Sequence, residues 1–198
     1  KSIISGGKNV AVGCDSLKLN ESGAWNIAMG HESLTSNVSA HYNIAIGGQT
    51  LTNSTSNANT AVGVTSLKVV TTGTLNTAIG RNTGSYITVG DKNTFLGAET
   101  NANAQNLDNT TALGYGAITT ASNQIMMGTS TEHVVIPGTT ESSGTDSGSL
   151  QVLGGAGIAK KLNVGGDVDM NSKLRVTDDV SLNSKLYVAT TTNMVGAV

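Results

Sequence analysis

The sequence predicts an all-β chain: a repetitive β-roll or β-solenoid with coils of about seventeen residues, followed by a thin β-stalk of 12-residue strand-turn units. Three observations predict it. A phrase of the form Asn-x-Ala-aliphatic-Gly recurs through residues 1–128, the phrase alternates with the period of two that is typical of a strand, and a shorter period follows near the C-terminus. A short fixed period indicates one structural unit stacked on copies of itself.

The repeated phrase has six clear copies, each opened by an asparagine and closed by a glycine. These pairs are Asn9 and Gly13, Asn26 and Gly30, Asn43 and Gly47, Asn59 and Gly63, Asn76 and Gly80, and Asn93 and Gly97. Two weaker copies end at Gly114 and Gly128, and the steps between successive closing glycines are 17, 17, 16, 17, 17, 17 and 14. At ~4.8 Å per layer, about seven such coils would span on the order of 34 Å.

Strand alternation divides each phrase into two faces. The residue before the glycine is always large, as at Val12 and Met29, and this face is expected to fill the interior. The opposite face carries alanine in most copies, as at Ala11 and Ala28, and is expected to allow close approach of another backbone. The asparagines are expected to stack into a ladder in which each amide bonds to the copies above and below.

A second phrase completes each early coil. A leucine lies four residues after the closing glycine, at Leu17, Leu34, Leu51 and Leu67. It is expected to anchor a second short strand to the same core, after which a polar turn reverses the chain. Gly84 and Asn101 replace the leucine in later copies, so those coils are expected to be distorted.

The remainder of the chain has a different pattern. The repeat vanishes in residues 129–148, where Ser, Thr and Gly dominate, and this segment is interpreted as a transition. Residues 149–198 carry the 12-residue period. The predicted domains are therefore a β-roll at 1–128, the transition at 129–148 and a β-stalk at 149–198.

The 12-residue units place three leucines at equivalent positions, Leu162, Leu174 and Leu186. A strand-turn unit of this size is too thin to bury its own leucine and valine, so another surface must cover them. Identical chains side by side are the economical solution. The three leucines are accordingly the candidates for the core of a trimer.

The repeats are similar to those of a known group of proteins. Residues 1–128 resemble the head repeats of trimeric autotransporter adhesins and, more closely, the longer Asn-Thr-Ala-x-Gly…Ser-Leu…Thr-Thr-Gly repeats of fibre proteins of bacteria, phages and large algal viruses. Residues 148–158 and 162–168 resemble segments of viral fibres. The resemblance implies a homotrimer in which each subunit winds a left-handed β-roll around a shared axis. The coils of this chain are longer than those of the bacterial heads.

Composition gives no sign of catalysis or of a charged partner. The formal net charge of -2 offers no reason to expect nucleic acid, and no apolar stretch approaches the ~20 residues that cross a bilayer. Cys14 is the single cysteine, which excludes an intrachain disulfide framework. No catalytic triad, carboxylate pair or phosphate loop emerges, so an enzyme is not expected. No cofactor is expected either.

The histidines do not predict a metal site. His31, His41 and His133 lie at unrelated repeat positions with no partner at a spacing that would make their side chains converge. Three copies of one histidine on a trimer axis are the one arrangement that would supply a cluster. Surface or turn positions are the favoured interpretation, and no metal is predicted.

Trp25 and Tyr42 are the receptor-contact candidates. They occupy the same place in adjacent coils, directly before the repeat asparagine, and one layer apart they would form a platform for a sugar ring. Strand alternation places both residues on the same face as the large aliphatic side chains, and Leu75 takes the same position in a later coil. Packing in the core or at its rim is therefore favoured. Four asparagines begin Asn-x-Ser/Thr sequons, and a turn-forming role is the default interpretation for them: Asn20, Asn37, Asn53 and Asn109.

The sequence therefore predicts a non-enzymatic structural fibre segment of a virion, a rigid trimeric spike that displays or forms a host-attachment surface. Its expected partners are itself as a homotrimer, a host-surface receptor such as a glycan, and other virion proteins at the virion surface, without nucleic acid or membrane insertion. The alternative is the head of a bacterial trimeric adhesin, extracellular on the cell surface. Less favoured are a monomeric ice-binding β-solenoid, for which each coil offers one threonine such as Thr60, and a polysaccharide-degrading tailspike.

Overall fold

The computed structural model describes residues 6–138, 147–165, 168, 170 and 174–177. The chain divides into two compact units, Lys1–Pro137 and Gly138–Val198. All regular secondary structure in the described residues is β. The strands are β1 (Val10–Val12), β2 (Ile27–Met29), β3 (Ile44–Ile46), β4 (Thr60–Val62), β5 (Thr77–Ile79), β6 (Thr94–Leu96), β7 (Asn101–Ala102), β8 (Thr111–Leu113), β9 (Ile118–Thr119) and β10 (Ile125–Met127).

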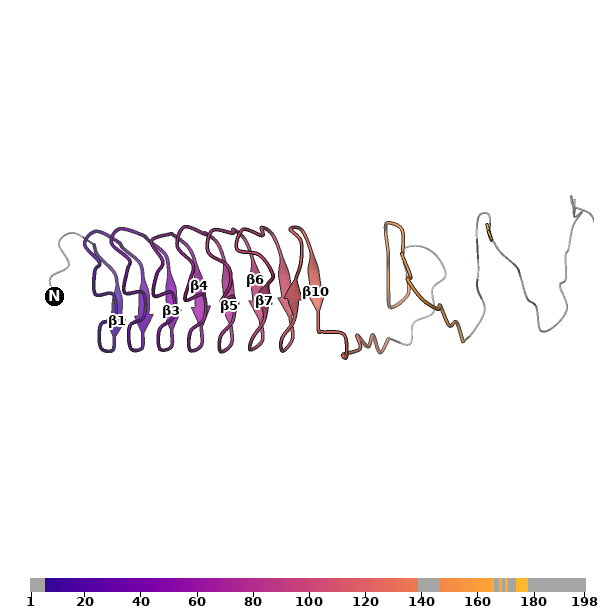
Figure 1. The fold of residues 1–198 in the computed structure, drawn as a ribbon, viewed down its shortest axis with the longest axis horizontal. Helices are drawn as coiled ribbons and strands as arrows, with labels where there is room; N and C mark the ends of the chain where they lie inside the picture. The colour runs from indigo at the N-terminus through magenta and orange to yellow at the C-terminus, as the bar shows by residue number, and fades with distance from the viewer. Residues whose placement is uncertain (1–5, 139–146, 166–167, 169, 171–173, 178–198) are drawn as a thin grey trace, which may run out of the picture. The chain divides into compact units, whose positions relative to one another are not determined.

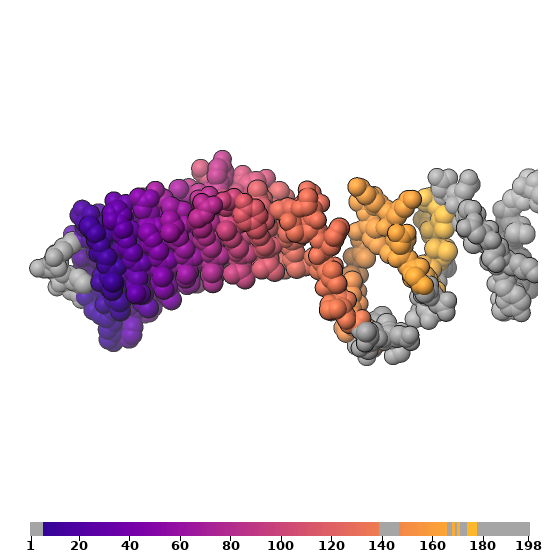
Figure 2. Space-filling model, turned by 90° about the horizontal axis from the view of Figure 1, so that it is seen from below, coloured from indigo at the N-terminus to yellow at the C-terminus, as the bar shows by residue number. Residues whose placement is uncertain are grey.

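The first unit is a β-solenoid. Eight strands form one parallel sheet in the order β1-β2-β3-β4-β5-β6-β8-β10, while β7 and β9 form a separate parallel pair. The register keeps the repeat in phase, because Ala11 pairs with Ala28 and Ala28 with Ala45, one full repeat further along the chain each time. Figure 1 shows the coils following one another along the unit, and Figure 2 shows successive layers in direct contact. The predicted all-β solenoid, with coils of about seventeen residues, is confirmed.

The predicted orientation of the two strand faces is wrong. Ala28, Ala45 and the equivalent alanines of later strands are fully buried, whereas Met29 and Ile46 on the opposite face are 40% and 37% exposed. The interior is filled from the other wall of the coil, where the leucines after each glycine are also buried. Because leucine supplies the bulk, only alanine fits on the strand side, and the large aliphatic residues point outward.

The segment after each early glycine is a turn, so the second strand predicted there is wrong for the first four coils. Leu17, Leu34, Leu51 and Leu67 have left-handed backbone conformations, with φ between 47° and 52°. Their N–H groups still bond to the next coil, as from Leu34 to the Thr50 carbonyl at 3.0 Å. A second strand forms only later, as β7 and β9. This wall is therefore mainly a stack of hydrogen-bonded turns that hold leucine in the core.

The glycine at each corner is required by close stacking. Gly30 has a φ of 137°, and a Cβ atom there would lie 2.4 Å from the carbonyl oxygen of Gly47 in the next coil. A side chain would have to push the layers apart, and the backbone conformation is one that only glycine adopts readily. The closing glycine of the phrase therefore sets the spacing between coils.

The asparagines form the predicted ladder, which joins amide to amide from Asn9 to Asn43 and continues through backbone N–H groups in later coils. Asn26 Oδ1 accepts from the backbone N–H and the Nδ2 of Asn43 at 3.0 and 3.2 Å, and Asn26 Nδ2 donates to the Ala40 carbonyl at 2.8 Å. Thr110 ends the ladder by donating its N–H and hydroxyl to Asn93 Oδ1. In the described residues, every buried side-chain nitrogen and oxygen has a hydrogen-bond partner.

The coils that lack the leucine keep the register of the main sheet, and the expected distortion is confined to the opposite wall, where β7 and β9 replace turns. Ala78 pairs with Phe95, and Phe95 pairs with Ala112. Phe95 is fully buried at an alanine position. A Cβ atom at Gly84 would lie 3.0 Å from Phe95 Cδ2, so the aromatic ring occupies the space that leucine fills in earlier coils. In this coil the large core side chain therefore comes from the strand, whereas in earlier coils it comes from the turn on the opposite wall.

The second unit does not test the predicted stalk. The described residues 147–165, 168, 170 and 174–177 contain no strand. Leu162 and Leu174 are 67% and 66% exposed in the single chain, and Leu186 lies outside the described residues. Their place in a trimer core stays a prediction.

Candidate interaction surfaces

The outer face of the eight-stranded sheet carries one large apolar side chain from every coil. This aliphatic row consists of Val12, Met29, Ile46, Val62, Ile79, Leu96, Leu113 and Met127. Val62 is half-buried, and the others are between 37% and 53% exposed. Because the strands pair in register, these side chains form a continuous line along the solenoid.

A second line, the mixed row, runs beside the aliphatic row two residues earlier in each strand. It consists of Val10, Ile27, Ile44, Thr60, Thr77, Thr94, Thr111 and Ile125. At ~4.8 Å between strands, the two rows together cover roughly 300–400 Å². Apolar patches of that size on a single chain are often functional. Sequence reasoning missed this surface because it assigned the aliphatic row to the interior.

The four threonines of the mixed row differ from those that bond to the next coil, such as Thr50 and Thr83. Thr50 and Thr83 donate their hydroxyls to the carbonyls of Gly63 and Gly97 at 2.6 and 2.7 Å. Within the described part of the chain, the hydroxyls in the mixed row form no hydrogen bond; they belong to Thr60, Thr77, Thr94 and Thr111. Each of these residues is half-buried. Their hydroxyls are therefore available to solvent or to another molecule.

Trp25 and Tyr42 lie at a corner of successive coils, and neither is in the core. Their exposures are 50% and 62%, and their backbone φ angles are 61° and 62°. Of the favoured interpretation, packing in the core or at its rim, the core position is therefore not adopted by the single chain. A bulky residue at positive φ is an outlier, and neither side chain gains burial in return. Lys8 Nζ lies 4.0 Å from the Trp25 ring centroid, and the rings of His41 and Tyr42 are 6.1 Å apart.

The histidines are not brought together. His41 Nδ1 accepts the N–H of Ala24 at 2.9 Å, which gives it a structural role between coils. His31 lies beside Glu32 at 3.9 Å, and His133 is exposed. No group of three or more His, Cys, Asp or Glu side chains in the described ranges is placed to hold a metal ion.

Two of the four sequons have a structural role. Asn20 and Asn37 are fully buried, and their Nδ2 atoms donate to the carbonyls of Gly23 and Ala40, each at 3.1 Å. These side chains hold the turn that closes the coil and are inaccessible to modification. Asn53 and Asn109 are exposed.

A corner of the solenoid carries polar side chains that connect coils. Gln49 Nε2 donates to Glu32 Oε2, and Lys68 Nζ donates to Gln49 Oε1, both at 2.8 Å. Further along, Arg81 and Tyr115 both bond to the Glu99 carboxylate. These groups link successive layers, which accounts for them without a ligand. Exposed pairs of this kind contribute little stability individually.

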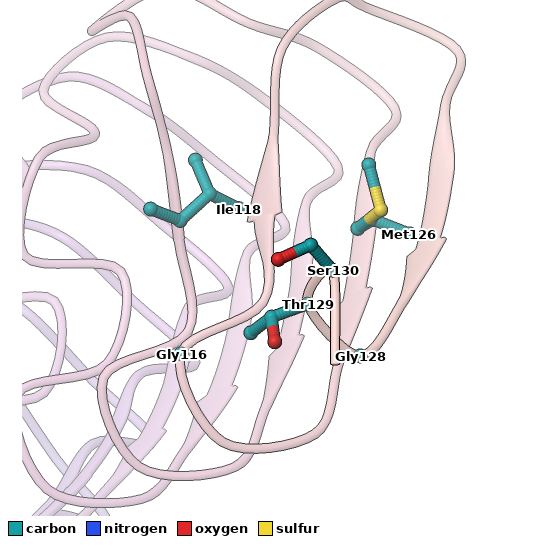
Figure 3. Close-up of a pocket in the computed structure, with 6 residues that line it drawn as sticks. All are labelled: Gly116, Ile118, Met126, Gly128, Thr129 and Ser130. Atoms are coloured by element: carbon teal, nitrogen blue, oxygen red, sulfur yellow. The ribbon is translucent and has the colours of Figure 1, made fainter. Parts of the chain in front are cut away.

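A small open pocket lies at the C-terminal end of the solenoid. Its volume is about 410 Å³, and its lining consists of Gly116, Ile118, Met126, Gly128, Thr129 and Ser130. Figure 3 shows Ile118 and Met126 on either side of the two hydroxyl residues. Its lining includes the hydroxyls of Thr129 and Ser130 but no charged side chain. Sequence reasoning did not anticipate this pocket, because it lies where the repeat ends and no pattern marks its lining.

Comparisons with protein-family models, curated proteins and solved structures produced no match to this chain. Among the described residues, no helix is long and apolar enough to cross a membrane. The sheet's outer face and the Trp25–Tyr42 corner are therefore assessed on their own geometry.

Proposed function

We propose that this chain is a non-enzymatic structural fibre segment of a virion, assembled as a homotrimer into a rigid spike that displays or forms a host-attachment surface. The observation that supports the proposal is the aliphatic row, which presents a large apolar side chain in every coil of the sheet. The resemblance of the repeats to trimeric fibres supports three copies. The proposal assigns no catalytic residue, metal or cofactor.

The aliphatic row provides a driving force of the right size. Complete burial of one such side chain contributes roughly 1.5–3 kcal/mol, so covering the exposed two-fifths to one-half contributes about 0.6–1.5 kcal/mol each. The seven side chains exposed to that extent would contribute about 4–10 kcal/mol per chain. Association costs on the order of 4–15 kcal/mol in lost translational and rotational freedom. The row therefore offsets much of that cost, and the mixed row adds further contacts.

The solenoid also suits a rigid spacer. Each coil is hydrogen-bonded to the next along both the strand wall and the turn wall, as at Ile27 N to Asn43 O (2.8 Å) and Leu34 N to Thr50 O (3.0 Å). A spike of this construction presents its corners to the surroundings at fixed intervals. We assign receptor contact, with a glycan as the expected partner, to the corner that holds Trp25 and Tyr42.

Charge substitution tests the assembly. Ile46→Glu places a carboxylate in the aliphatic row, where an apolar interface would strongly disfavour it. Val64→Glu, at a corner residue that is 54% exposed, is the matched control. By sedimentation velocity, the parent and Val64→Glu should sediment as trimers and Ile46→Glu as a smaller species. Equal sedimentation of all three proteins would refute the role of the row.

A paired substitution tests attachment separately. Trp25→Ala with Tyr42→Ala should reduce binding to host cells while the sedimentation coefficient stays that of a trimer. Unchanged binding by a folded, trimeric variant would place the contact elsewhere. A bacterial adhesin head remains the alternative, and the two are distinguished by whether the same polypeptide carries a membrane-anchor barrel or a virion-binding domain.

A second candidate function is ice binding by a monomer. The observation that favours it is the line of four unbonded threonine hydroxyls on a regular parallel sheet. Thermal hysteresis of a monomeric sample would support this function. Its absence, together with a trimeric mass, would remove it.

A further inference from the structure

The outer face of the sheet changes character along the solenoid. In the mixed row, β1, β2 and β3 carry aliphatic residues, and we name these three coils the dry zone. The next four strands, β4, β5, β6 and β8, carry threonine and form the threonine zone. β10 returns to isoleucine. The aliphatic row continues unchanged through both zones.

This boundary matters because the aliphatic row alone specifies no alignment. Its members repeat at every coil, so two such rows would fit equally well after a shift of one coil. Registers that are not fixed by a distinctive position tend to slip. In other assemblies, a single polar position in an apolar seam selects one alignment.

The threonine hydroxyls supply such a position. A hydroxyl that is covered by an apolar surface without a hydrogen-bond partner is costly, and buried polar groups are accordingly almost always bonded. The hydroxyls of Thr60, Thr77 and the other two threonines have no hydrogen-bond partner within the described chain. Each strand of the sheet defines one level along the solenoid. A surface that covers the whole face must therefore offer hydrogen-bonding groups opposite the four threonine strands and apolar groups opposite the three strands before them.

We propose that the threonine zone is a register key for self-assembly, and that the covering surface is the same face of further copies, parallel and in register. This inference rests on the proposed homotrimer. The chain's own face has the required order of three aliphatic levels, four hydroxyl levels and one aliphatic level. Hydroxyls then meet hydroxyls, directly or through shared water, and aliphatic side chains meet aliphatic side chains.

Other alignments create mismatches. A slip of one coil places Thr60 against Ile44 at one boundary and Ile125 against Thr111 at the other. An antiparallel arrangement mismatches the levels of β2, β3, β6 and β8, which is four of the eight strands in the sheet. The parallel, in-register arrangement is the only one of the three without a mismatch.

The single cysteine provides the measurement. Cys14 is exposed and lies in the first coil, so a nitroxide attached there reports the alignment of copies by pulsed dipolar spectroscopy. The parent should give one narrow distance between labels. An axial offset combines in quadrature with the lateral separation of the labels, so slips of several coils and the antiparallel arrangement, with offsets up to about 34 Å, give clearly longer distances.

The decisive variant replaces all four threonines by valine, which removes the hydroxyls and keeps the shape. We expect it to assemble with several label distances. Serine at the same four positions keeps the hydroxyls and should retain the single distance. Ile27→Thr with Ile44→Thr moves the first boundary toward the first coil without removing any hydroxyl. Combined with Val10→Thr and Ile125→Thr it erases both boundaries, and this all-threonine variant should also broaden the distances.

The outcomes are distinct. A valine variant that assembles with the parent's single distance overturns the register key. If the valine variant does not fold, the all-threonine variant decides, and a single distance there also overturns the register key. A parent that shows no dipolar coupling and the mass of one chain refutes the proposed homotrimer, and the register key with it. Several distances in the parent refute the key alone.

Discussion

Replacing Phe95 by alanine should destabilise the solenoid by about 3–5 kcal/mol, the usual cost of removing a buried aromatic side chain. Phe95 is fully buried, and its ring fills the space beside Gly84 where earlier coils hold leucine. The substitution therefore leaves a cavity beside Gly84.

Leucine at Gly84 should also be destabilising on its own. Its Cβ atom would lie 2.5 Å from Leu67 Cδ2 and 3.0 Å from Phe95 Cδ2, and overpacking of this kind costs about 1–3 kcal/mol. The φ of 61° adds roughly 1 kcal/mol for a non-glycine residue. Gly84→Leu combined with Phe95→Ala instead restores the alanine and leucine of the earlier coils. We expect the double variant to lie within about 2 kcal/mol of the parent.

The assay is a double-mutant cycle by chemical denaturation at one chain concentration, followed by circular dichroism. The fluorescence of Trp25, the single tryptophan, reports the N-terminal coils as a second probe. The predicted coupling between the two substitutions is favourable by at least about 2 kcal/mol. Additive effects within about 0.5 kcal/mol would show that the two positions do not share one space, and would refute the compensation.

Three further predictions concern the ladder, a carboxylate and metals. Asn59→Ala removes the acceptor of the Asn76 N–H and the donor to the Gly73 carbonyl, and should lower the free energy of unfolding by about 2–4 kcal/mol. As a control, Asn106→Ala at an exposed position should change the free energy of unfolding by less than about 0.5 kcal/mol. The Thr129 hydroxyl and N–H both donate to the Glu132 carboxylate and lower its pKa. The turn is therefore stabilised above the ordinary glutamate pKa, and this stabilisation is lost as pH falls through the lowered value. An NMR titration of Glu132 should give a pKa below the ordinary value, and Thr129→Ala should raise it. EDTA should leave the melting temperature unchanged, and a fall of several degrees would reveal a metal site.

Periodicity was sufficient to predict the stacking, the strand in each repeated phrase and the asparagine ladder, because each depends only on which residues recur at the same place. It could not decide which face of the strand lies inside. Alternation assigns Ala28 and Met29 to opposite faces, but the choice between them depends on Leu17 and Leu34 across the coil. Size alone therefore led to the wrong orientation.

The turn wall was missed for a related reason. Leu34 and Glu32 both have positive φ, although neither residue type signals such a conformation. The hydrogen bonds between coils hold these residues in place, and that information is absent from a single repeat. The outer apolar surface was missed as a consequence, whereas Trp25 and Tyr42 were identified from their shared position and proved to be exposed.

The most direct test of the account is the native mass of the unsubstituted chain, measured by light scattering after size-exclusion chromatography across a range of concentrations. An outward-facing aliphatic row that is covered by identical copies predicts a mass near three times 20.0 kDa that does not change on dilution. A stable, folded species of 20.0 kDa at all concentrations would contradict it.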